Sequence, residues 1–432
     1  MKLSNWNSYL QIGESTGLIY NSLSDKFLAV YDLEILDALK GENFDGLSDD
    51  VKKQLKEIDA LVSTDKDEVE QLKNEITKID NDTSFFHLIV NPTLDCNLHC
   101  WYCYENHVHG VAMTESLLDS VKSLVNSRIS ENPELSFIYI SFFGGEPLLA
   151  FDSVVHKLLD WLRNRCNETG LKLHVQFTSN GVKINDEIIN FLKEFDCAFQ
   201  ITLDGGKDLH DKVRFEKGGV PTYDRIVTNI CNLVNAGIYV VTRINYTQKN
   251  VKSISEIIND FKKQTITKPE YLRFDLQKVW QDKPSEDEKL RIDESIKSYR
   301  NDLRNMGLNV ANNKLVNYIR ESCYADKTNE VLINYNGDVF AYTARDFTKE
   351  NRKGRLLEDG KVEWTNSLFP NRNSLKLTKE ICTKCRIAPL CGGGCHQKTI
   401  EGLSHDFCNV GFTDKEIDDL ILERFEEYFL NR

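Results

Sequence analysis

The segment Asn91-Pro-Thr-Leu-Asp-Cys96-Asn-Leu-His-Cys100-Trp-Tyr-Cys103-Tyr104 directly follows an apolar run that begins at Phe85. Its three cysteines are separated by three and then two residues, and we expect them to lie on one loop. Three thiolates at this spacing can bind three irons of a [4Fe–4S] cube and leave the fourth iron open. An open iron can chelate a substrate or a cofactor. A structural zinc site is the alternative, with His99 and His107 as candidate further ligands.

A strand–helix alternation surrounds this loop. We expect apolar strands near 85–91, 137–143, 173–179, 198–204, 238–246 and 271–276, with amphipathic helical segments between them. Six such repeats predict an α/β fold in which a parallel sheet curls into a partial (β/α)6 barrel. In folds of this kind the chemistry lies at the C-terminal ends of the strands.

Polar motifs stand where the next predicted strands end. They are Gly144-Gly145-Glu146-Pro147, Ser179-Asn180-Gly181 and Thr202-Leu203-Asp204-Gly205, with Arg243 and Asn245 on the fifth strand. Each of them alone is also compatible with a turn or a cap. Their common placement at successive strand ends favours a shared site.

Together these residues resemble the radical S-adenosylmethionine (SAM) superfamily, with its aromatic CxxxCxYC form at Cys96, Cys100, Tyr102 and Cys103. The resemblance implies that the open iron binds the amino and carboxylate groups of SAM and passes one electron to its sulfonium. The products are methionine and a 5′-deoxyadenosyl radical that abstracts a substrate hydrogen. The three cysteines are therefore the predicted catalytic centre, and Asp204 is a further catalytic candidate by its location.

The resemblance also implies SAM contacts at the strand ends. Glu146 would accept hydrogen bonds from the SAM ammonium, and the glycines before it would let the backbone approach the cofactor. His210-Asp211-Lys-Val-Arg214 resembles the HDxxR segment of the family, in which Arg214 would pair with a carboxylate of SAM or substrate. The implied cofactor-binding residues are Tyr102, Gly144, Gly145, Glu146, Pro147, Ser179, Asn180, Arg214 and Arg243.

A second cysteine-rich segment reads Cys382-x2-Cys385-x5-Cys391-x3-Cys395-x12-Cys408. Alone, this spacing is also compatible with a zinc ribbon. Beside the first loop it resembles the SPASM domain, which carries auxiliary iron–sulfur clusters in enzymes that modify peptides and proteins. The resemblance implies an auxiliary [4Fe–4S] cluster on Cys382, Cys385, Cys391 and Cys408.

The same resemblance breaks at the first auxiliary cluster of that domain. Cys323 and Cys395 are available, but Tyr342 stands five residues after Gly337, where the family has a cysteine. A phenol is a poor substitute for a thiolate on iron. We therefore expect the first auxiliary cluster to be lost and the second to persist.

The N-terminal 82 residues show a different pattern. Short strands are expected at 8–12, 17–22 and 27–31, followed by helices at 32–39, 48–58 and 66–79. This order resembles the PqqD-like peptide-recognition element, a small winged-helix-like α+β module that captures leader peptides. The alternative is a structural extension that caps the next domain.

Composition narrows the class of protein. The net charge of -13 argues against a nucleic-acid surface, which needs clustered Lys and Arg. The twelve cysteines, with no signal peptide or membrane span apparent in the sequence, predict a cytoplasmic protein with reduced thiols.

We expect four segments, namely a peptide-recognition-like module (1–82), a radical SAM partial barrel (83–279), a helical linker (280–318) and a SPASM-type domain (319–432). This layout implies a maturase of ribosomally made peptides that forms a cross-link, a thioether or an epimerised residue. Its implied partners are a precursor peptide with a leader and an electron donor such as a flavodoxin or ferredoxin. A sulfatase-maturase-like enzyme and a catalytically silent iron–sulfur scaffold remain as alternatives.

Overall fold

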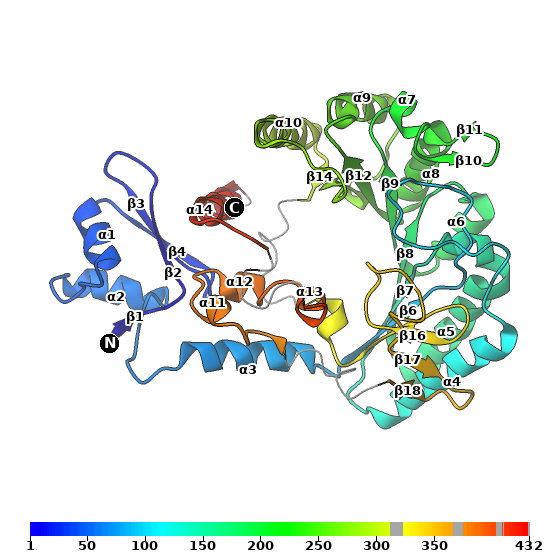
Figure 1. Ribbon diagram of the computed structural model, residues 1–432, viewed down its shortest axis with the longest axis horizontal. Coiled ribbons are helices and arrows are strands. Elements are labelled where there is room, and N and C mark those ends of the chain that lie inside the picture. The colour runs from blue at the N-terminus through cyan, green and yellow to red at the C-terminus, as the bar shows by residue number, and fades with distance from the viewer. Residues whose placement is uncertain (312–322, 366–374, 403–407, 409, 431–432) are drawn as a thin grey trace. The chain divides into compact units, whose positions relative to one another are not determined.

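The computed structural model describes residues 1–311, 323–365, 375–402, 408 and 410–430 (Figure 1). The chain divides into two compact units. The larger contains Thr83–Ala311 and the described part of 329–369. The smaller contains Met1–Asp82 and the described parts of 312–328 and 370–432.

A parallel sheet forms the centre of the larger unit. Its six principal strands lie side by side in chain order and are β6 (Phe85–Val90), β7 (Phe137–Phe142), β8 (Lys172–Ser179), β9 (Asp196–Leu203), β12 (Tyr239–Tyr246) and β13 (Leu272–Lys278). Every neighbouring pair among them is parallel. The predicted strand positions and the α/β class are confirmed.

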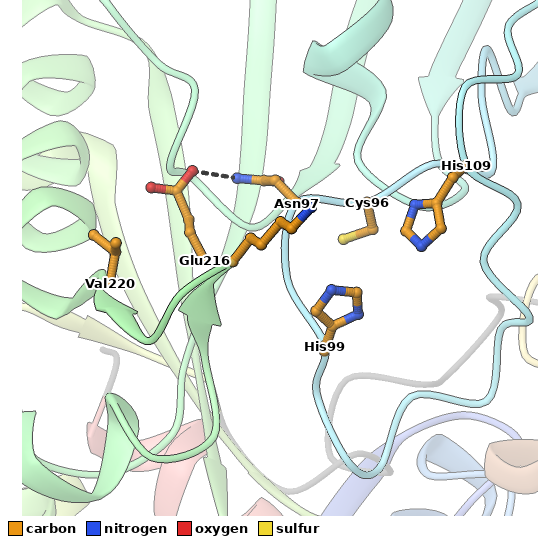
Figure 2. Close-up of a pocket in the computed structure, with 7 residues that line it drawn as sticks. Cys96, Asn97, His99, His109, Glu216 and Val220 are labelled. Carbon is orange, nitrogen blue, oxygen red and sulfur yellow. Dashed lines mark hydrogen bonds between the residues drawn. The ribbon is translucent and has the colours of Figure 1, made fainter.

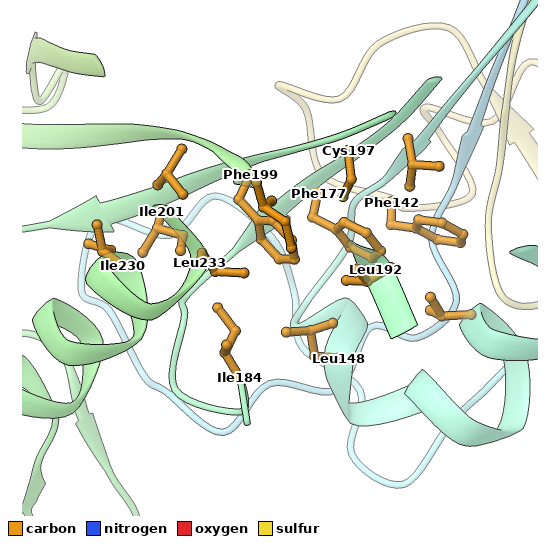
Figure 3. Close-up of a cluster of buried hydrophobic side chains, with 14 of the residues drawn as sticks. Phe142, Leu148, Phe177, Ile184, Leu192, Cys197, Phe199, Ile201, Ile230 and Leu233 are labelled. Atoms are coloured by element: carbon orange, nitrogen blue, oxygen red, sulfur yellow. The ribbon is translucent and has the colours of Figure 1, made fainter. Parts of the chain in front are cut away.

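One face of this sheet is apolar and covered by helices. Along β7, Ile138, Ile140 and Phe142 are buried while the residues between them are half-buried. Phe142, Phe177 and Phe199 stack from strand to strand with ring centroids 5.0 and 4.7 Å apart (Figure 3). The covering elements include α4 (Glu115–Glu131), η1 (Pro147–Ala150), η2 (Phe151–Val155), α5 (His156–Thr169), α6 (Asp186–Leu192), α8 (Tyr223–Ala236), η3 (Val251–Ser253) and α9 (Ile254–Lys263).

The other face of the sheet carries polar side chains. Gln176, Gln200, Arg243 and Asp275 are half-buried there, each between two buried neighbours on its strand. Strand register brings Arg243 beside Asp275. Because successive side chains of a strand point to opposite faces, the sheet has an apolar face under the helices and a polar face on the other side.

The C-terminal half of the chain extends this sheet. Strand β15 (Glu330–Ile333) pairs in parallel with β6, and β16 (Asp338–Phe340), β17 (Gly354–Leu356) and β18 (Val362–Trp364) continue it antiparallel. Beyond β13 lies β14 (Asn309–Val310), and the remaining elements of the unit are α7 (Lys207–His210), β10 (Phe215–Glu216), β11 (Val220–Pro221), η4 (Pro269–Tyr271) and α10 (Glu286–Asn305).

These contacts cut across the predicted segment boundaries. Strand β15 belongs to the larger unit because it fills the open edge of β6, so the predicted segment 319–432 is shared between the two units. Helix α10 was expected in a linker, but it buries Ile292, Ile296 and Leu303 in the core of the larger unit. Residues 312–318 of that predicted linker lie outside the described residues.

The N-terminal part of the smaller unit has the predicted order of three strands and three helices. They are β2 (Asn7–Gln11), β3 (Gly17–Asn21), β4 (Lys26–Val30), α1 (Leu33–Lys40), α2 (Asp49–Glu57) and α3 (Glu68–Asp80), with a short additional pair of β1 (Lys2–Leu3) and β5 (Leu61–Val62). Ser48 caps α2 as expected, accepting a hydrogen bond from the Val51 N–H. The resemblance to a PqqD-like element stays a prediction.

Residues from both chain ends share one core in this unit. Leu18 and Tyr20 of β3 pack in a cluster with Ile387, Leu390 and residues of α14 (Asp414–Leu430). The short elements of the cysteine-rich part are η5 (Tyr324–Asp326), α11 (Glu380–Thr383), α12 (Ala388–Cys391) and α13 (His396–Ile400). Residues 1–82 are therefore one part of a larger compact unit, because their sheet buries its face against the C-terminal segment.

A buried ion network also joins three segments of the smaller unit. Lys376 Nζ lies 2.5 Å from Asp80 Oδ2 and 3.7 Å from Asp326 Oδ2. Asp326 Oδ2 in turn lies 2.6 Å from Nδ1 of His396. All four side chains are almost fully buried, so the charges depend on one another for compensation.

We predict that Lys376→Ala destabilises the smaller unit by about 3–5 kcal/mol, because it leaves two carboxylates buried without their cation. Urea denaturation followed by circular dichroism would measure the change. Lys384→Ala is the matched control, since Lys384 pairs with Glu380 on the surface and we expect no measurable effect. Equal midpoints for both variants would contradict the role given to the network.

Candidate functional site

The three cysteines lie on the loop that follows β6. Cys96 is buried, Cys100 is half-buried and Cys103 is exposed. The loop returns toward its own start, because the Val108 N–H donates to the Leu94 carbonyl (3.1 Å). The Asp95 carboxylate holds the two limbs together by accepting from His109 Nδ1 and from the Gly110 N–H, both at 2.8 Å. The loop is therefore closed on itself by its own hydrogen bonds.

The two glycines after β7 pack against this loop. A Cβ on Gly145 would lie 2.2 Å from the Asp95 carbonyl oxygen, and one on Gly144 would lie 2.6 Å from that of Thr93. Gly144 also has a φ of +93°, a conformation that side-chain-bearing residues rarely adopt. The sequence suggested that these glycines admit a cofactor. The structure gives them another task, which is to let the backbone contact the cysteine loop.

Glu146 is fully buried and ties two strand ends together. Its carboxylate accepts from the Ser179 hydroxyl (2.8 Å), the Asn180 N–H (2.7 Å) and the Leu148 N–H (3.1 Å). Burial raises the pKa of Glu146, and these hydrogen bonds counteract the rise. Glu146, the predicted acceptor for the SAM ammonium, thus also joins the ends of β7 and β8 by hydrogen bonds.

A second polar network connects the cysteine loop to β9 and β12. The Tyr102 hydroxyl donates to the Asp204 carboxylate (2.7 Å), and Arg214 pairs with the same carboxylate. Arg214 Nη2 (2.9 Å) and Asn245 Nδ2 (3.1 Å) donate to the Tyr102 oxygen. Asp204 and Arg214 are 2 % and 8 % exposed. With both Asp204 oxygens engaged, the geometry favours a positioning role for this residue over a catalytic one.

His210 contacts this network through the backbone of Asp204. The Asp204 N–H donates to His210 Nδ1 (3.2 Å), so the neutral ring carries its proton on Nε2, which faces the Thr222 hydroxyl at 3.2 Å. The Thr222 hydroxyl in turn donates a hydrogen bond to the Arg214 carbonyl (2.6 Å). Burial lowers the pKa of His210 to about 3, which keeps the ring neutral. The HDxxR-like segment therefore orients Arg214 through hydrogen bonds.

A cavity of about 600 Å³ lies beside the first cysteine (Figure 2). It is lined by Cys96, Asn97, His99, His109, Glu216, Lys217 and Val220. Asn97 links its two sides, because Asn97 Nδ2 donates to Glu216 Oε1 (3.1 Å) and Asn97 Oδ1 accepts from Asn180 Nδ2 (2.8 Å). The cavity thus reaches a thiol of the cysteine loop from the side of the β10–β11 hairpin.

The thiols of the loop need a metal to ionise. Burial raises the pKa of Cys96 to about 12 and also raises that of Cys100, so the protein alone keeps both protonated near neutral pH. Iron would displace these protons, as metals do on binding thiols. The donor set of three thiols on one loop fits a [4Fe–4S] cluster that is held by Cys96, Cys100 and Cys103.

One contact at this loop bears on the zinc alternative. Cys103 Sγ lies 3.6 Å from His107 Nε2, which gives a thiol–imidazole pair. A structural zinc site needs four ligands. Over the described ranges, no three His, Cys, Asp or Glu side chains are grouped so that they could hold a metal ion, and this applies to the three thiols of the loop as well as to a zinc site.

Several residues of the site carry no signal in the sequence. Glu105 lies near Asp346, and burial raises the pKa of Glu105 to about 8, with Asp346 adding to the shift. Asp346 also accepts from the Asn106 N–H (3.0 Å), and Gln281 Nε2 donates to the Tyr102 carbonyl (2.8 Å). These contacts join residues more than 170 positions apart, so no local spacing could have revealed them.

The second cysteine group lies within the smaller unit. Cys382, Cys385, Cys391 and Cys408 line one cavity of about 320 Å³, together with apolar side chains such as Ile387, Phe412 and Ile417. Burial raises the pKa of Cys391 to about 12. Four thiols around one cavity are a donor set that fits the implied auxiliary cluster.

The residues expected around the first auxiliary cluster divide between the units. Cys323 and Cys395 belong to the smaller unit and Tyr342 to the larger one, where the Arg345 guanidinium lies 5.8 Å from its ring centre. Burial is the main cause that raises the pKa of the half-buried Tyr104 on the cysteine loop, and Tyr342 adds slightly to the rise. Tyr342 is thus in the unit that contains the first cysteine loop.

Comparison with known proteins identifies the larger unit. Residues 90–261 match the Radical SAM superfamily. An uncharacterized protein of Methanocaldococcus jannaschii is 32% identical over 142 residues, which cover 32% of this chain and 44% of that protein. A cysteine-type anaerobic sulfatase-maturating enzyme of Clostridium novyi is 26% identical over 183 residues, or 41% of this chain and 48% of the enzyme. The chain thus spans less than half the length of these relatives.

Two solved structures have the same fold. Native anSMEcpe with bound AdoMet is 19% identical with a TM-score of 0.58, covering 80% of this chain and 97% of that one. SuiB of Streptococcus suis bound to S-adenosylmethionine is 17% identical with a TM-score of 0.52, covering 93% of this chain and 97% of that one. Residues 90–261 are therefore a radical SAM domain, whose family uses a [4Fe–4S] cluster and SAM. No helix in the described ranges has the length and apolarity of a membrane span.

We predict that Cys96→Ala, Cys100→Ala and Cys103→Ala each abolish 5′-deoxyadenosine formation from SAM, because the cube loses one of three ligands. Reconstituted wild type should hold roughly eight irons per chain and each variant roughly four. Iron analysis and chromatography of the dithionite reaction would measure both. Cys166→Ala, at a buried thiol of α5, is the control and should match wild type. Turnover in any loop variant would refute the ligand set, and twelve irons would refute the loss of the first auxiliary cluster.

Proposed function

We propose that this chain is a radical SAM maturase that modifies a ribosomally made precursor peptide. The observation that carries the proposal is the presence of two cysteine sites in one chain, a three-thiol loop in the radical SAM domain and a four-thiol cavity in the smaller unit. Likeness to an enzyme of the same radical chemistry adds support, since the radical SAM cyclopropyl synthase TigE is 24% identical over 156 residues, or 33% of this chain and 32% of that enzyme.

In this proposal the cluster and SAM together supply a carbon radical that abstracts a hydrogen atom from the substrate. The protein holds the cluster through Cys96, Cys100 and Cys103. Tyr102 and the Gly144–Gly145 backbone keep the loop fixed against the strand ends. A rigid first layer of ligands fixes where the radical forms relative to the substrate.

The uncovered face of the sheet supports a polypeptide substrate. Gln176 and Gln200 are half-buried there and carry amide groups, and Arg243 lies beside Asp275 in the strand register. Such a face offers both donors and acceptors to a peptide main chain, whereas an apolar substrate would leave these groups unpaired. The carbonyl and N–H groups of an extended segment are partners that suit it.

Leader capture is assigned to strand β4 of the smaller unit. Strand β4 pairs with β3 on one side, and the sheet of described strands ends there in the order β2-β3-β4. An edge strand can accept a further strand from a peptide. Tyr31, which follows β4 and is 80% exposed, would pack on an added strand.

A sulfatase-maturase-like activity is the second candidate, because sulfatase-maturating enzymes recur among the relatives and the similar structures. A catalytically silent scaffold is less compatible with the complete cysteine loop. Both alternatives differ from the proposal in what the reduced, SAM-loaded protein does to a peptide.

The test is incubation of the reconstituted, reduced protein with SAM and the peptide encoded by a neighbouring short reading frame. We expect mass spectrometry to show loss of a hydrogen pair for a cross-link or thioether, or deuterium uptake from D2O for epimerisation. A sulfatase-derived Cys or Ser peptide serves as the control substrate. Conversion of that control alone to an aldehyde would select the second candidate, and absence of SAM cleavage would select the scaffold.

Leader binding makes a separate prediction. Tyr31→Ala should weaken binding of the fluorescein-labelled leader about fivefold, because an exposed aromatic anchor is worth about 1 kcal/mol. Fluorescence anisotropy on the full chain is the measurement, since deleting residues 1–82 would also expose the core around Ile387 and Ile421. Leu290→Ala, at an exposed apolar residue of α10, should bind as wild type does. Unchanged affinity in Tyr31→Ala would place recognition elsewhere.

A further inference from the structure

Cys103 is the exposed cysteine of the first loop, and a histidine ring lies against its sulfur. From this geometry we infer that His107 is a positioning residue, which donates a hydrogen bond to the Cys103 thiolate and so makes a [4Fe–4S] cluster on the loop easier to reduce. The inference rests on the cluster chemistry of the proposed function, and it is independent of which peptide is modified.

The backbone is held in place on both sides of His107. The Asn106 N–H donates to Asp346 Oδ1 (3.0 Å), and the Asn106 side chain donates to the same carboxylate. On the other side, the Val108 N–H donates to the Leu94 carbonyl (3.1 Å). All of these residues belong to the larger unit. The His107 ring therefore projects from a segment whose two neighbouring residues are fixed.

The contact between the ring and the sulfur has the form of an N–H···S hydrogen bond. His107 Nε2 lies 3.6 Å from Cys103 Sγ. A thiolate that binds iron has no hydrogen to donate, so its sulfur acts only as an acceptor. The hydrogen of this bond must therefore lie on Nε2, where the imidazolium and one neutral tautomer both carry it. The donor does not depend on a charge on the ring.

A side-chain N–H also lies near a second thiol of the loop. Asn180 Nδ2 is 3.9 Å from Cys96 Sγ. Asn180 takes part in the hydrogen bonds at the strand ends as well, through its backbone N–H to Glu146 and its side chain to Asn97. The His107 ring lies outside those hydrogen bonds. It can therefore be replaced without breaking the contacts between strands, and its effect on a cluster can be measured alone.

A donor on a ligand sulfur acts on the reduction potential of a cluster. Reduction adds one negative charge, which the irons and their sulfur ligands share. An N–H group aimed at a ligand sulfur stabilises this added charge, so hydrogen bonds to the sulfurs raise the potential. Water can also donate to an exposed sulfur. The effect of His107 is therefore the difference between a fixed donor and mobile water.

A carboxylate near the same thiol acts in the opposite direction. The Asp346 carboxylate is bound to Asn106, three residues after Cys103. Negative charge at this place opposes the addition of an electron to a cluster. His107, the next residue along the chain, directs its N–H to the same thiol, and so it offsets part of this unfavourable charge.

The test is a redox titration of the reconstituted holoenzyme without SAM or peptide. Dithionite supplies one electron to the cluster through mediators, and no bond forms or breaks. Electron paramagnetic resonance measures the reduced cluster, whose signal is identified in a separate sample by its change on addition of SAM. For His107→Leu we expect the ratio of reduced to oxidised cluster at a fixed potential to fall about tenfold, which is about 59 mV for one electron.

Two further variants separate the N–H donor from the rest of the side chain. His107→Gln keeps an N–H donor and should recover most of the loss seen in His107→Leu. His99→Leu is the matched control, because it removes the same kind of side chain from the same loop. The His99 ring faces that of His109, with centroids 6.0 Å apart, and we expect this variant to keep the wild-type potential.

The outcomes that overturn the inference are distinct. A wild-type potential in His107→Leu overturns it, and so does an equal fall in His99→Leu. An equal fall in His107→Leu and His107→Gln would exclude the N–H group as the cause. Loss of iron from His107→Leu alone would give the ring a structural role instead. Because the potentials are measured without peptide, failure of peptide modification leaves them unchanged, and the proposed function can fail separately.

Discussion

The buried pairing of Asp204 with Arg214 is the contact on which the geometry of the radical SAM loop depends. Both charges are removed from water, and each is compensated by the other and by the Tyr102 hydroxyl. Loss of one partner would leave a buried charge at a cost of about 3–5 kcal/mol. Because Tyr102 lies between Cys100 and Cys103, this cost opposes any displacement of these two cysteines, which are predicted cluster ligands. Asn245 extends the same network to β12.

The parts of the fold that the sequence could predict are those with strong local patterns. The six principal strands were placed to within about three residues, because each alternates between apolar and polar faces or ends in a polar motif. The cysteine loop and the spacing of its three cysteines were equally visible. The hydrogen bonds by which Glu146 joins the ends of β7 and β8 could not be predicted, because its partners Ser179 and Asn180 lie more than 30 positions away. The need for a glycine at position 145 was not visible either, because it arises from contact with the Asp95 carbonyl in the folded chain.

Long-range pairing also explains why the compact units differ from the predicted segments. Strand β15 pairs with β6 although the paired residues are about 240 positions apart in the sequence, and the residue pattern of neither strand predicts this pairing. In the smaller unit, the Phe27 ring stacks on Tyr20, and its centroid lies 5.3 Å from that of Phe425 in α14. The N-terminal and C-terminal segments therefore share a core. A peptide added to β4 would therefore bind a unit that also contains the four-thiol cavity. The proposed recognition strand and the four-thiol cavity are thereby parts of one compact unit.

The two cysteine sites offer iron very different surroundings. Beside Cys96 the cavity is rimmed by Lys217, two histidines and Glu216, whereas Cys391 lies among apolar side chains such as Phe412. Solvent exposure and nearby charge set the potential of an iron–sulfur cluster. A cluster held by Cys96 would lie beside a polar opening, which tolerates added negative charge. A cluster held in the second cavity would lie against an apolar shell, which opposes added negative charge. The two clusters would therefore differ in reduction potential, and the one beside the polar opening would be the easier to reduce.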